Sequence, residues 1–438
     1  MKDFLIVFVI KILNLILKIC KKKGGNLPGK LAYDWDRNIF KYFKIDCPVI
    51  AVTATNGKTM TNNAIRTVFE TAGKKVVSNI EGNNMETGIL STLLKNCSLT
   101  GKVKADYLVF EVDENYIPVL FKDLKLDTLV ILNFFRDQLD RNGEIDTLIN
   151  KINTFLNDFK GNLVLNGNDP NVVRLGLSNP DNNNIFYFGV DKTEESTEVS
   201  TEACDGKFCP ICNEKLEYDY YQYSQIGKFK CPNCNYGDLE MYKTIQNIDF
   251  NNKSFDVSDT HYEINSNSIY IMYNFAAVIA CASLYNIESN YIQEALKSFK
   301  LDNGRLENTL INNVPTLVNL AKNPAGFNVS LRLLKDDDDK KDLFLVVNDN
   351  KSDGYDISWI WDVNFEDLNN YNIDRIILSG LRPYDLAIRI KTAGFDVDKI
   401  ECYENLDEAV KSLYSTNVKK YVIANYTALQ PTRKALGL

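Results

Sequence analysis

The residues best suited to chemistry lie at 51–65, "AVTATNGKTMTNNAI", where an apolar run meets a helix-like run. A phosphate-binding loop needs small residues, a helix N-terminus, a lysine and a hydroxyl that can reach Mg²⁺. Gly57, Lys58 and Thr59 supply these groups at the junction, although Val52 occupies the position of the first glycine in the generic motif. We therefore predict a phosphate-binding loop, with a chance turn as the alternative.

Carboxylates follow a second strand-like run, "FEVDE" at 110–114. Glu111 and Asp113 lie near the end of a strand that should neighbour the strand before the loop. Because Mg²⁺ takes oxygen ligands and substrate phosphates, a carboxylate there can complete its coordination together with Thr59. The alternative is ordinary surface charge.

Four of the ten cysteines form two Cys-Pro-x-Cys pairs, Cys209 with Cys212 and Cys231 with Cys234. This spacing can place four thiolates tetrahedrally around one metal ion, so it predicts a closed, structural zinc site. The other six cysteines are scattered, which does not fit a secreted disulfide framework and is typical of a cytosolic chain.

A loop rich in acids, "NDNKSDGYDISWIWD" at 348–362, directly follows the strand-like "DLFLVV". Its four aspartates have only Lys351 as a basic neighbour in the segment. They could mark a site or simply favour the start of a helix, where acids are stabilised. For its two tryptophans, Trp359 and Trp361, a place in the core is the safer expectation and an interface anchor the alternative.

Strand-like and helix-like runs alternate along most of the chain, which predicts an α/β fold with a mostly parallel sheet. Functional loops should then lie at the carboxyl ends of the strands. Changes of pattern predict an N-terminal helix, a central domain with an inserted cysteine-rich segment, and a smaller C-terminal α/β domain. The boundaries we expect are 1–30, 31–310 with the insertion at 198–240, and 311–438.

The N-terminal segment at 4–23 is strongly apolar but is interrupted by Lys11, Asn14 and Lys18 at helical spacing. It is marginal for spanning a membrane, and it lacks the cleavage site of a signal peptide. The polar stripe and the lysines at 21–23 suit a helix lying in a membrane interface. A buried helix packed on the next domain is an equal alternative.

Overall charge and histidine content narrow the function. The net charge of −8 argues against general binding of nucleic acid, which needs a basic surface. The single histidine, His261, lies in a polar stretch without a nearby nucleophile. A Cys–His or Ser–His–Asp nucleophile built from this chain alone is therefore not expected.

Several motifs together resemble the Mur ligases of cell-wall synthesis: TxTNGKT, EVDE, NFFRDQxDRxGEID, NGNDP, DNGRLE at 302–307 and NLAKNPAGFN at 319–328. The four-cysteine insertion and the NDNxxDGxDxSWIWD loop resemble one branch of that family, MurT. The resemblance implies a P-loop central domain with an inserted zinc ribbon and a smaller, Rossmann-like C-terminal domain.

The same resemblance implies a reaction. ATP would phosphorylate the α-carboxyl of D-glutamate in the lipid II stem peptide, and ammonia would attack the acyl phosphate to give D-isoglutamine. Asn274, Arg305 and the Asn166–Asp169 turn match motif positions that line the nucleotide cleft. The implied ATP-binding residues are Thr55, Asn56, Gly57, Lys58, Thr59, Asn274 and Arg305, with Thr59 and Glu111 binding Mg²⁺.

The ammonia would come from a partner, a GatD-like glutamine amidotransferase subunit that binds the C-terminal domain. By resemblance, Asp356 would complete the partner's Cys–His pair by orienting its imidazole, a catalytic role. The scarcity of histidine in this chain agrees with a separate glutaminase. The expected location is cytoplasmic, possibly peripheral at the inner face of the membrane through residues 4–23.

Three departures from the family pattern bear on the alternatives. Ala54 replaces a usual glycine, Ile271 replaces a usual asparagine, and Gln138 replaces the histidine of the amino-acid-adding Mur ligases. Gln138 and the acidic loop favour the amidating branch. A stand-alone amino-acid ligase and a non-catalytic nucleotide-binding scaffold are the alternatives.

Overall fold

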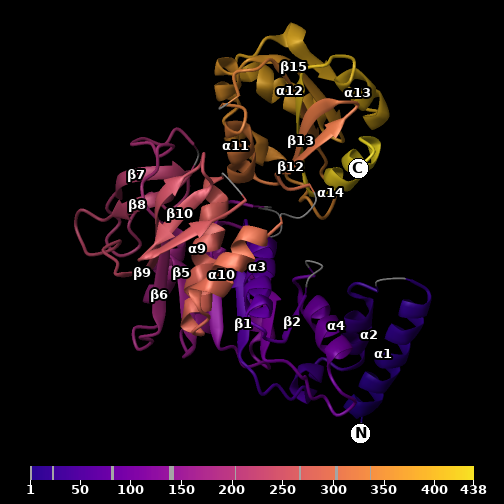
Figure 1. Ribbon diagram of the computed structural model, residues 1–438, viewed down its shortest axis with the longest axis vertical. Coiled ribbons are helices and arrows are strands. Elements are labelled where there is room, and N and C mark those ends of the chain that lie inside the picture. Colours follow the sequence, from indigo (N-terminus) through magenta and orange to yellow (C-terminus); the bar gives the residue numbers. More distant parts are fainter. Residues whose placement is uncertain are drawn as a thin grey trace. The chain divides into compact units, whose positions relative to one another are not determined.

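A computed structural model describes residues 2–21, 24–79, 83–137, 143–202, 204–265, 268–300, 304–335 and 337–438 (Figure 1). Gln138 lies outside these residues. The chain forms two compact units: unit 1 comprises 1–134, 146–198 and 206–299, and unit 2 comprises 135–145, 199–205 and 300–438.

Unit 1 is built on a nine-stranded sheet of order β11-β10-β9-β6-β5-β4-β1-β3-β2. The strands from β2 to β9 pair in parallel, whereas β9, β10 and β11 are antiparallel. Their bounds are β1 Val49–Thr53, β2 Val76–Ser78, β3 Tyr107–Glu111, β4 Thr128–Ile131, β5 Asn162–Asn166, β6 Ile185–Val190, β9 Met241–Asp249, β10 Ser254–Val257 and β11 Thr260–Glu263. The prediction of an α/β fold with a mostly parallel sheet is confirmed.

Helices α3 (Lys58–Thr71), α9 (Ile269–Leu284) and α10 (Ser289–Ser298) pack beside one another in unit 1 (Figure 1). Phe69 of α3 and Tyr285 after α9 meet Tyr107 of β3, with ring centroids 4.5–5.7 Å apart. Because edge-on aromatic pairs add to the stability gained by burial, this cluster fixes α3, and with it the loop before α3, on the sheet.

The N-terminal helices α1 (Lys2–Ile19) and α2 (Leu27–Trp35) pack with α4 (Glu86–Asn96). Gly29 makes this contact possible, because a Cβ there would lie 1.9 Å from the Thr87 carbonyl oxygen. Its amide instead donates to Ser91 Oγ at 2.8 Å. Helix α7 (Ile145–Leu156) and the hairpin of β7 (Glu217–Tyr223) and β8 (Ile226–Lys230) complete the larger elements of this part of the chain.

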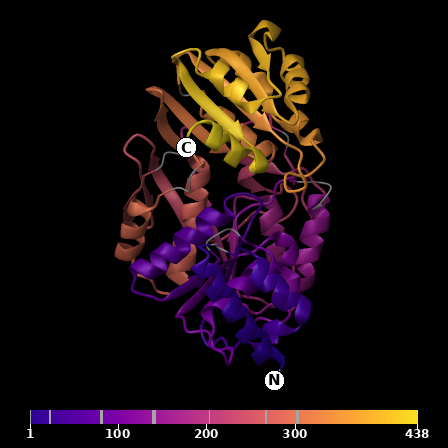
Figure 2. The ribbon, with the colours of Figure 1, turned by 90° about the vertical axis from the view of Figure 1, so that its right-hand side faces the viewer.

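Unit 2 has a six-stranded sheet of order β12-β13-β17-β14-β15-β16, parallel except for the β12–β13 hairpin. Helices cover both faces (Figure 2): α11 and α12 pack in one apolar cluster, α13 and α14 in the other. The bounds are β12 Glu307–Ile311, β13 Val314–Leu320, β14 Lys341–Val347, β15 Ile373–Gly380, β16 Ile400–Cys402, β17 Lys419–Ala424, α11 Pro324–Arg332, α12 Pro383–Thr392, α13 Leu406–Leu413 and α14 Tyr426–Ala435.

Candidate active site

The loop at 54–57 leaves the carboxyl end of the fully buried strand β1 and turns directly into α3. Gly57 makes that turn with φ +92°, and a Cβ there would lie 2.4 Å from Asn274 Oδ1. Only glycine fits both the backbone conformation and this close approach. Asn274, from α9, is therefore brought against the loop, as is Met60, whose Sδ lies 3.2 Å from Asn274 Nδ2.

Asn133, just after β4, fixes the backbone of the loop. Its Oδ1 accepts from the Asn56 amide at 2.9 Å, and its Nδ2 donates to the Asn56 carbonyl at 3.0 Å. The Asn133 carbonyl also accepts from the Thr55 amide at 2.9 Å. Loop residues held in this way are preorganised for a ligand, since little conformational freedom remains to be lost on binding.

Lys58 is the first residue of α3, and its ammonium group is almost buried. Lys58 Nζ lies 3.1 and 3.2 Å from the two carboxylate oxygens of Glu114 and also donates to the Ala54 carbonyl. Glu114 was not singled out from the sequence, although it ends the same EVDE motif. Ala54 is buried and does not have a positive φ, so its methyl group is accommodated without backbone strain.

Glu111 fits the predicted magnesium ligand. It pairs with Val52 in the β1–β3 register, which places it beside the loop. Its Oε1 accepts from Asn84 Nδ2 at 3.0 Å, while Oε2 is buried without a hydrogen-bond partner among the described residues. Because a buried oxygen without a donor is costly, this atom is suited to a cation. Thr59, the second residue of α3, is half-buried, and Asp113 instead caps a short helix by accepting from the Asn115 amide.

The Asn166–Asp169 turn is buried and tied to the backbone around it. Asn166 Nδ2 donates to the Leu132 carbonyl at 2.8 Å, and Asp169 accepts from the Phe134 amide at 2.9 Å. Asn168 Oδ1 accepts from the Val190 amide at 2.8 Å. These bonds fix the exits of β4 and β5, so the turn positions the strand end that carries Asn133.

The four predicted zinc ligands come together. Their sulfur atoms all lie within 4.8 Å of one another, with Cys209–Cys234 at 3.5 Å and Cys212–Cys231 at 3.4 Å. A tetrahedral site with Zn–S bonds of about 2.3 Å needs sulfurs about 3.8 Å apart, so the cluster has the right size. The residues present fit a structural zinc ion.

The zinc ribbon, which we define as residues 206–240, packs on the Asn166–Asp169 turn. Gly227 donates to the Asn168 carbonyl at 2.9 Å, and the Tyr236 hydroxyl donates to the Pro170 carbonyl. Gln225 Nε2 donates to the Phe134 carbonyl at 2.8 Å. Phe134 directly follows Asn133, whose side chain holds the loop at 54–57. The zinc ribbon therefore binds the backbone next to the residue that fixes this loop.

In unit 2, three of the four predicted acids of the 348–362 loop bind groups far away in the sequence. Asp349 pairs with Arg382 at 2.9 Å, Asp353 accepts from the Thr427 amide at 2.8 Å, and Asp362 lies 3.6 Å from Arg136. Burial raises the pKa of Asp353.

Asp356 differs from these three, because its hydrogen bonds among the described residues stay within its own turn. It accepts from the Ser358 amide at 2.8 Å, which lowers the pKa of its carboxyl group. Its carboxylate is half-exposed.

The loop that carries Asp356 and its neighbours at the carboxyl edge of the second sheet expose aromatic and apolar side chains. The loops after β14, β15 and β17 are tied together through Asn348, whose Oδ1 accepts from the Leu381 amide and whose carbonyl accepts from Asn425 Nδ2. These loops and the helices they enter expose Tyr355, Trp361, Leu381, Tyr384 and Tyr426. The expectation of a core position is right for Trp359, which packs on Phe327, and wrong for Trp361, which is 51% exposed.

Two further positions singled out from the sequence are Arg305 and Ile271. Arg305 belongs to unit 2, in the turn before β12 where Gly304 faces Leu429 of α14, so its role in nucleotide binding stays a prediction. Ile271 is fully buried in α9.

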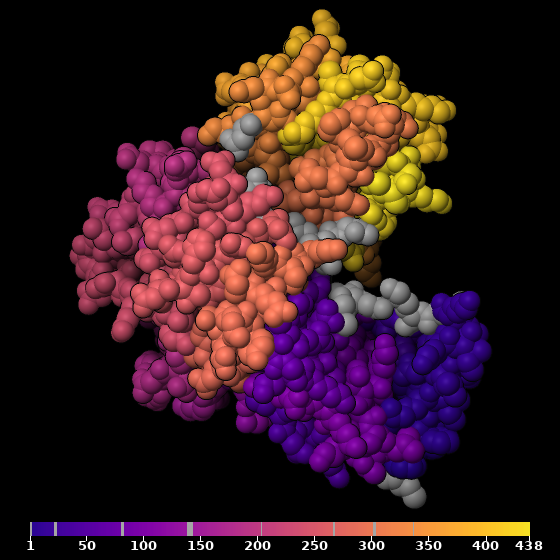
Figure 3. All heavy atoms as spheres, in the orientation of Figure 1, coloured from indigo at the N-terminus to yellow at the C-terminus, as the bar shows by residue number. Residues whose placement is uncertain are grey.

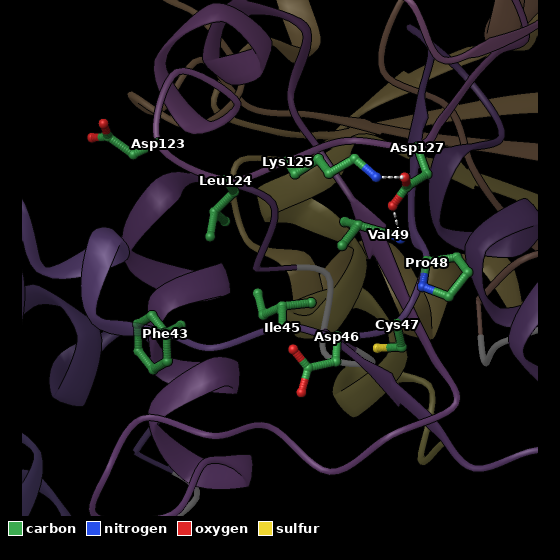
Figure 4. A pocket seen from close by; sticks show the side chains of 10 residues that line it. All are labelled: Phe43, Ile45, Asp46, Cys47, Pro48, Val49, Asp123, Leu124, Lys125 and Asp127. Atoms are coloured by element: carbon green, nitrogen blue, oxygen red, sulfur yellow. Dashed lines mark hydrogen bonds and ion pairs between the residues drawn. The ribbon is translucent and has the colours of Figure 1, made fainter.

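A pocket of about 400 Å³ opens at the other edge of the first sheet, before β1 (Figure 4). Asp127 lies on its wall, where it accepts from the Val49 amide and pairs with Lys125 at 2.6 Å. Ligands of open α/β sheets bind beyond the carboxyl ends of the strands, so this pocket is not the predicted nucleotide site.

Comparisons with known proteins agree with this geometry. Residues 52–282 match the family described as "Mur ligase middle domain". The structure resembles a pseudomurein peptide ligase type C from Methanothermus fervidus, with a TM-score of 0.69 and 21% identity over 92% of this chain and 80% of that one. It also resembles the MurF ligase of Thermotoga maritima solved in complex with ADP, with a TM-score of 0.61 and 15% identity over 93% and 84%. Fold and loop together define the Mur-ligase class.

A match in the C-terminal region assigns the chain to a narrower family within the Mur ligases. Residues 320–429 match the family "MurT ligase C-terminal". The chain is 30% identical, over 100% of its length and 98% of the relative's, to the lipid II isoglutaminyl synthase (glutamine-hydrolyzing) subunit MurT of Staphylococcus aureus. It is 31% identical, over 95% and 93%, to the subunit of that name in Streptococcus pneumoniae. The chain belongs to the MurT family.

Proposed function

We propose that this chain is the ATP-dependent synthetase subunit of a lipid II isoglutaminyl synthase. The observation that carries the proposal is full-length similarity to MurT subunits, combined with a preorganised loop that offers Lys58, Thr59 and Glu111. The reaction would convert the α-carboxyl group of D-glutamate in the lipid II stem peptide into an amide.

The chemistry needs two transfers. A carboxylate oxygen of the substrate takes the γ-phosphoryl group of ATP, which releases ADP and leaves an acyl phosphate. The nitrogen of ammonia then forms a bond to the acyl carbon, the C–O bond to phosphate breaks, and the nitrogen loses a proton. Catalysis of such transfers is mainly positioning and electrostatic stabilisation.

The residues of this chain are suited to those tasks. The amides at the start of α3 and the ammonium group of Lys58 would hold phosphate oxygens, while Asn56 and Thr55 are kept in place by Asn133. Thr59 and Glu111 would hold Mg²⁺, with Asn84 orienting Glu111. Magnesium, when bound, would neutralise charge on the phosphates.

Ammonia would come from a GatD-like glutaminase partner. The only histidine of the chain, His261, is exposed and lies 2.7 Å from Asp256, with no role in the loop. Asp356 would cross the interface to orient the partner's imidazole, as a carboxylate does in a catalytic triad. Its exposure, its lowered pKa and the exposed aromatic side chains of its own loop, Tyr355 and Trp361, support this role.

A lipid-linked substrate would bring the chain to the inner face of the membrane. Peripheral contact through residues 4–23 would then keep the chain near its substrate.

The test is amidation of lipid II by the chain co-purified with its candidate glutaminase, with glutamine and then ammonium as nitrogen donor. We expect wild type to use both donors. Asp356→Asn should lose glutamine-driven activity by about a hundredfold or more while keeping ammonium-driven activity. Asp349→Asn is the matched control, because its carboxylate binds Arg382 within the chain; it should keep both activities.

Other outcomes contradict parts of the proposal. If Asp356→Asn, but not wild type, loses amidation with both nitrogen donors, Asp356 acts in the active site of this chain or in its folding. Failure of wild type with both donors would favour a stand-alone amino-acid ligase if an added amino acid is joined, and a nucleotide-binding scaffold if it is not.

A further inference from the structure

Helix α1 packs on the protein through a mixed side, in which apolar residues are buried beside Lys11, and presents an apolar side outward. Its inner side packs through Ile6, Val7 and Ile10, and Lys11 Nζ donates to the Leu94 carbonyl of α4 at 3.3 Å. The alternative of a packed helix therefore holds for one side of α1, and the membrane-interface arrangement stays a prediction for the other side. The polar stripe predicted from the sequence does not face solvent along its whole length.

The outward side of α1 is an unbroken apolar stripe. Leu5, Phe8, Ile12, Leu15, Ile16 and Ile19 are all exposed, Leu15 to 58% and Ile19 to 72%. Their spacing of three and four residues places them on one face of a helix. At about 1.5 Å per residue the stripe from Leu5 to Ile19 is about 21 Å long.

Helix α2, which packs beside α1 (Figure 1), also exposes apolar side chains. It exposes Leu27, Leu31 and Trp35, which are spaced four residues apart and therefore lie on one side of the helix. We call the exposed apolar residues of both helices the α1–α2 face; they belong to the indigo margin of unit 1 in Figure 3. Soluble proteins seldom leave so many large apolar side chains together, so such a surface marks an interaction site.

The charge of the N-terminal region indicates which kind of partner the α1–α2 face would bind. Residues 1–41 contain nine lysines and arginines but only three aspartates, whereas the whole chain has a net charge of −8. Lys18, Lys21 and Lys30 are exposed on or beside the two helices. A basic, apolar helix surface with a tryptophan at its margin fits an anionic lipid surface, where aromatic rings and lysines lie at the headgroup level.

We propose that the α1–α2 face docks the chain on an anionic membrane surface, with α1 lying in the interface. Among the described helices none combines the length and apolar character that crossing a bilayer requires. The proposal rests on the proposed function only for the reason to be at a membrane, which is a lipid-linked substrate. The contact itself follows from the face and its charge.

The test is co-sedimentation of the full chain with vesicles, in the absence of nucleotide, glutamine and lipid II. Vesicles of phosphatidylcholine alone are compared with vesicles that also contain phosphatidylglycerol. We expect binding to the mixed vesicles, weakened by added salt, and at least about tenfold less in the double variant Ile12→Asp/Ile16→Asp. Lys18→Glu/Lys21→Glu should weaken binding to the mixed vesicles only.

Leu310→Asp is the matched control, because Leu310 is an exposed apolar residue, more exposed than Ile12 or Ile16, on strand β12 of unit 2. It should bind vesicles as wild type does, and circular dichroism should show all variants folded. No sedimentation of wild type with either vesicle would overturn the proposal, as would equal loss in Leu310→Asp. If Ile12→Asp/Ile16→Asp instead turns a dimer into a monomer in light scattering, a second copy covers the face and the membrane proposal is wrong. Amidation with detergent-solubilised lipid II is measured separately, so the failure of one proposal leaves the other standing.

Discussion

The loop at 54–59 and the loop at 348–362 start alike, each at the carboxyl end of a parallel strand that is buried along its whole length. They then differ in what surrounds their charged residue. Lys58 is almost buried between Glu114 and the loop backbone, and Asn133 and Asn274 close the loop from two other elements. Asp356 is half-exposed and bonded only within its own turn among the described residues, and its loop also exposes Tyr355 and Trp361.

This difference matches two kinds of ligand. A small anion is held by groups that converge on it from several elements and exclude water, where electrostatic interactions are strong. A protein partner needs a broad surface with exposed aromatic anchors and one projecting group. Under the proposed function, the same strand-end position would therefore serve chemistry in unit 1 and recognition of the partner in unit 2.

The largest effect should come from Lys58→Ala. We expect ATP turnover by the complex to fall by about a hundredfold or more, because the variant lacks the preorganised charge that, by the proposed function, would hold the transferred phosphate. Binding of the glutaminase, measured by calorimetry, should not change. Lys74→Ala, an exposed lysine after α3, is the control and should behave as wild type. If Lys58→Ala also loses glutaminase binding, the two loops do not have separate roles and this comparison is wrong.

Glu111→Gln should have the next largest effect. The buried Oε2 of Glu111 would lose its charge while the side chain keeps its shape, so the Mg²⁺ concentration that supports half-maximal ATP turnover should rise by about ten- to a hundredfold. Saturating Mg²⁺ should restore part of the activity. An unchanged Mg²⁺ requirement, with the protein folded, would remove Glu111 from the metal site.

Trp361→Ala tests the second loop. An exposed tryptophan that anchors a partner contributes about 2 kcal/mol when buried there, so glutaminase binding should weaken by about thirtyfold. Ammonium-driven amidation should persist, since Lys58 and Glu111 are untouched. Leu310→Ala, which removes an exposed apolar side chain from strand β12, should leave the affinity for the partner unchanged.

The smallest effect should follow from the zinc ribbon. Gln225→Leu removes the bond to the Phe134 carbonyl, and we expect ATP affinity to fall by about two- to tenfold, because a neutral hydrogen bond contributes about 1 kcal/mol. The affinity of Gln225→Leu for the glutaminase partner should not change. Cys231→Ser should abolish zinc binding, measured by atomic absorption, and lower ATP affinity at least as much as Gln225→Leu. If zinc loss weakens partner binding more than ATP binding, the ribbon does not support the first loop.

The sequence was most informative where function depends on residues close together in the chain. The TNGKT turn and the two cysteine pairs need fixed local spacing, and their geometry agrees with that prediction. Asn133, Glu114 and Gln225 were not recognised as partners, because their contacts depend on which strands are neighbours and in what register. Asn274 was assigned only through the family resemblance, since nothing in its helix separates it from a buried polar residue.

Other misses have local causes. Strands β9 and β12 are half-exposed along much of their length, so they lack the continuous apolar run that signals a buried strand. Trp359 and Trp361 lie in a five-residue 3₁₀ helix. Such a short element carries too few residues for periodicity to show which side chain faces the core. For α1, spacing predicted the polar stripe but could not show that Lys11 turns toward α4.

The packing of α1 also affects how the chain is made. Helix α1 packs on α2, which ends at Trp35, and on α4, which ends at Asn96, so the ribosome must add the residues from Ile19 to Asn96 before both partners of α1 are present. At typical rates of synthesis this takes about 4–15 s. During that time the outward apolar side of α1 is open and its inner side is not yet fully covered, so that a chaperone or a membrane can bind it. Aggregation during expression should therefore depend on α1 more than on any later helix, and Ile12→Asp/Ile16→Asp should raise the soluble yield.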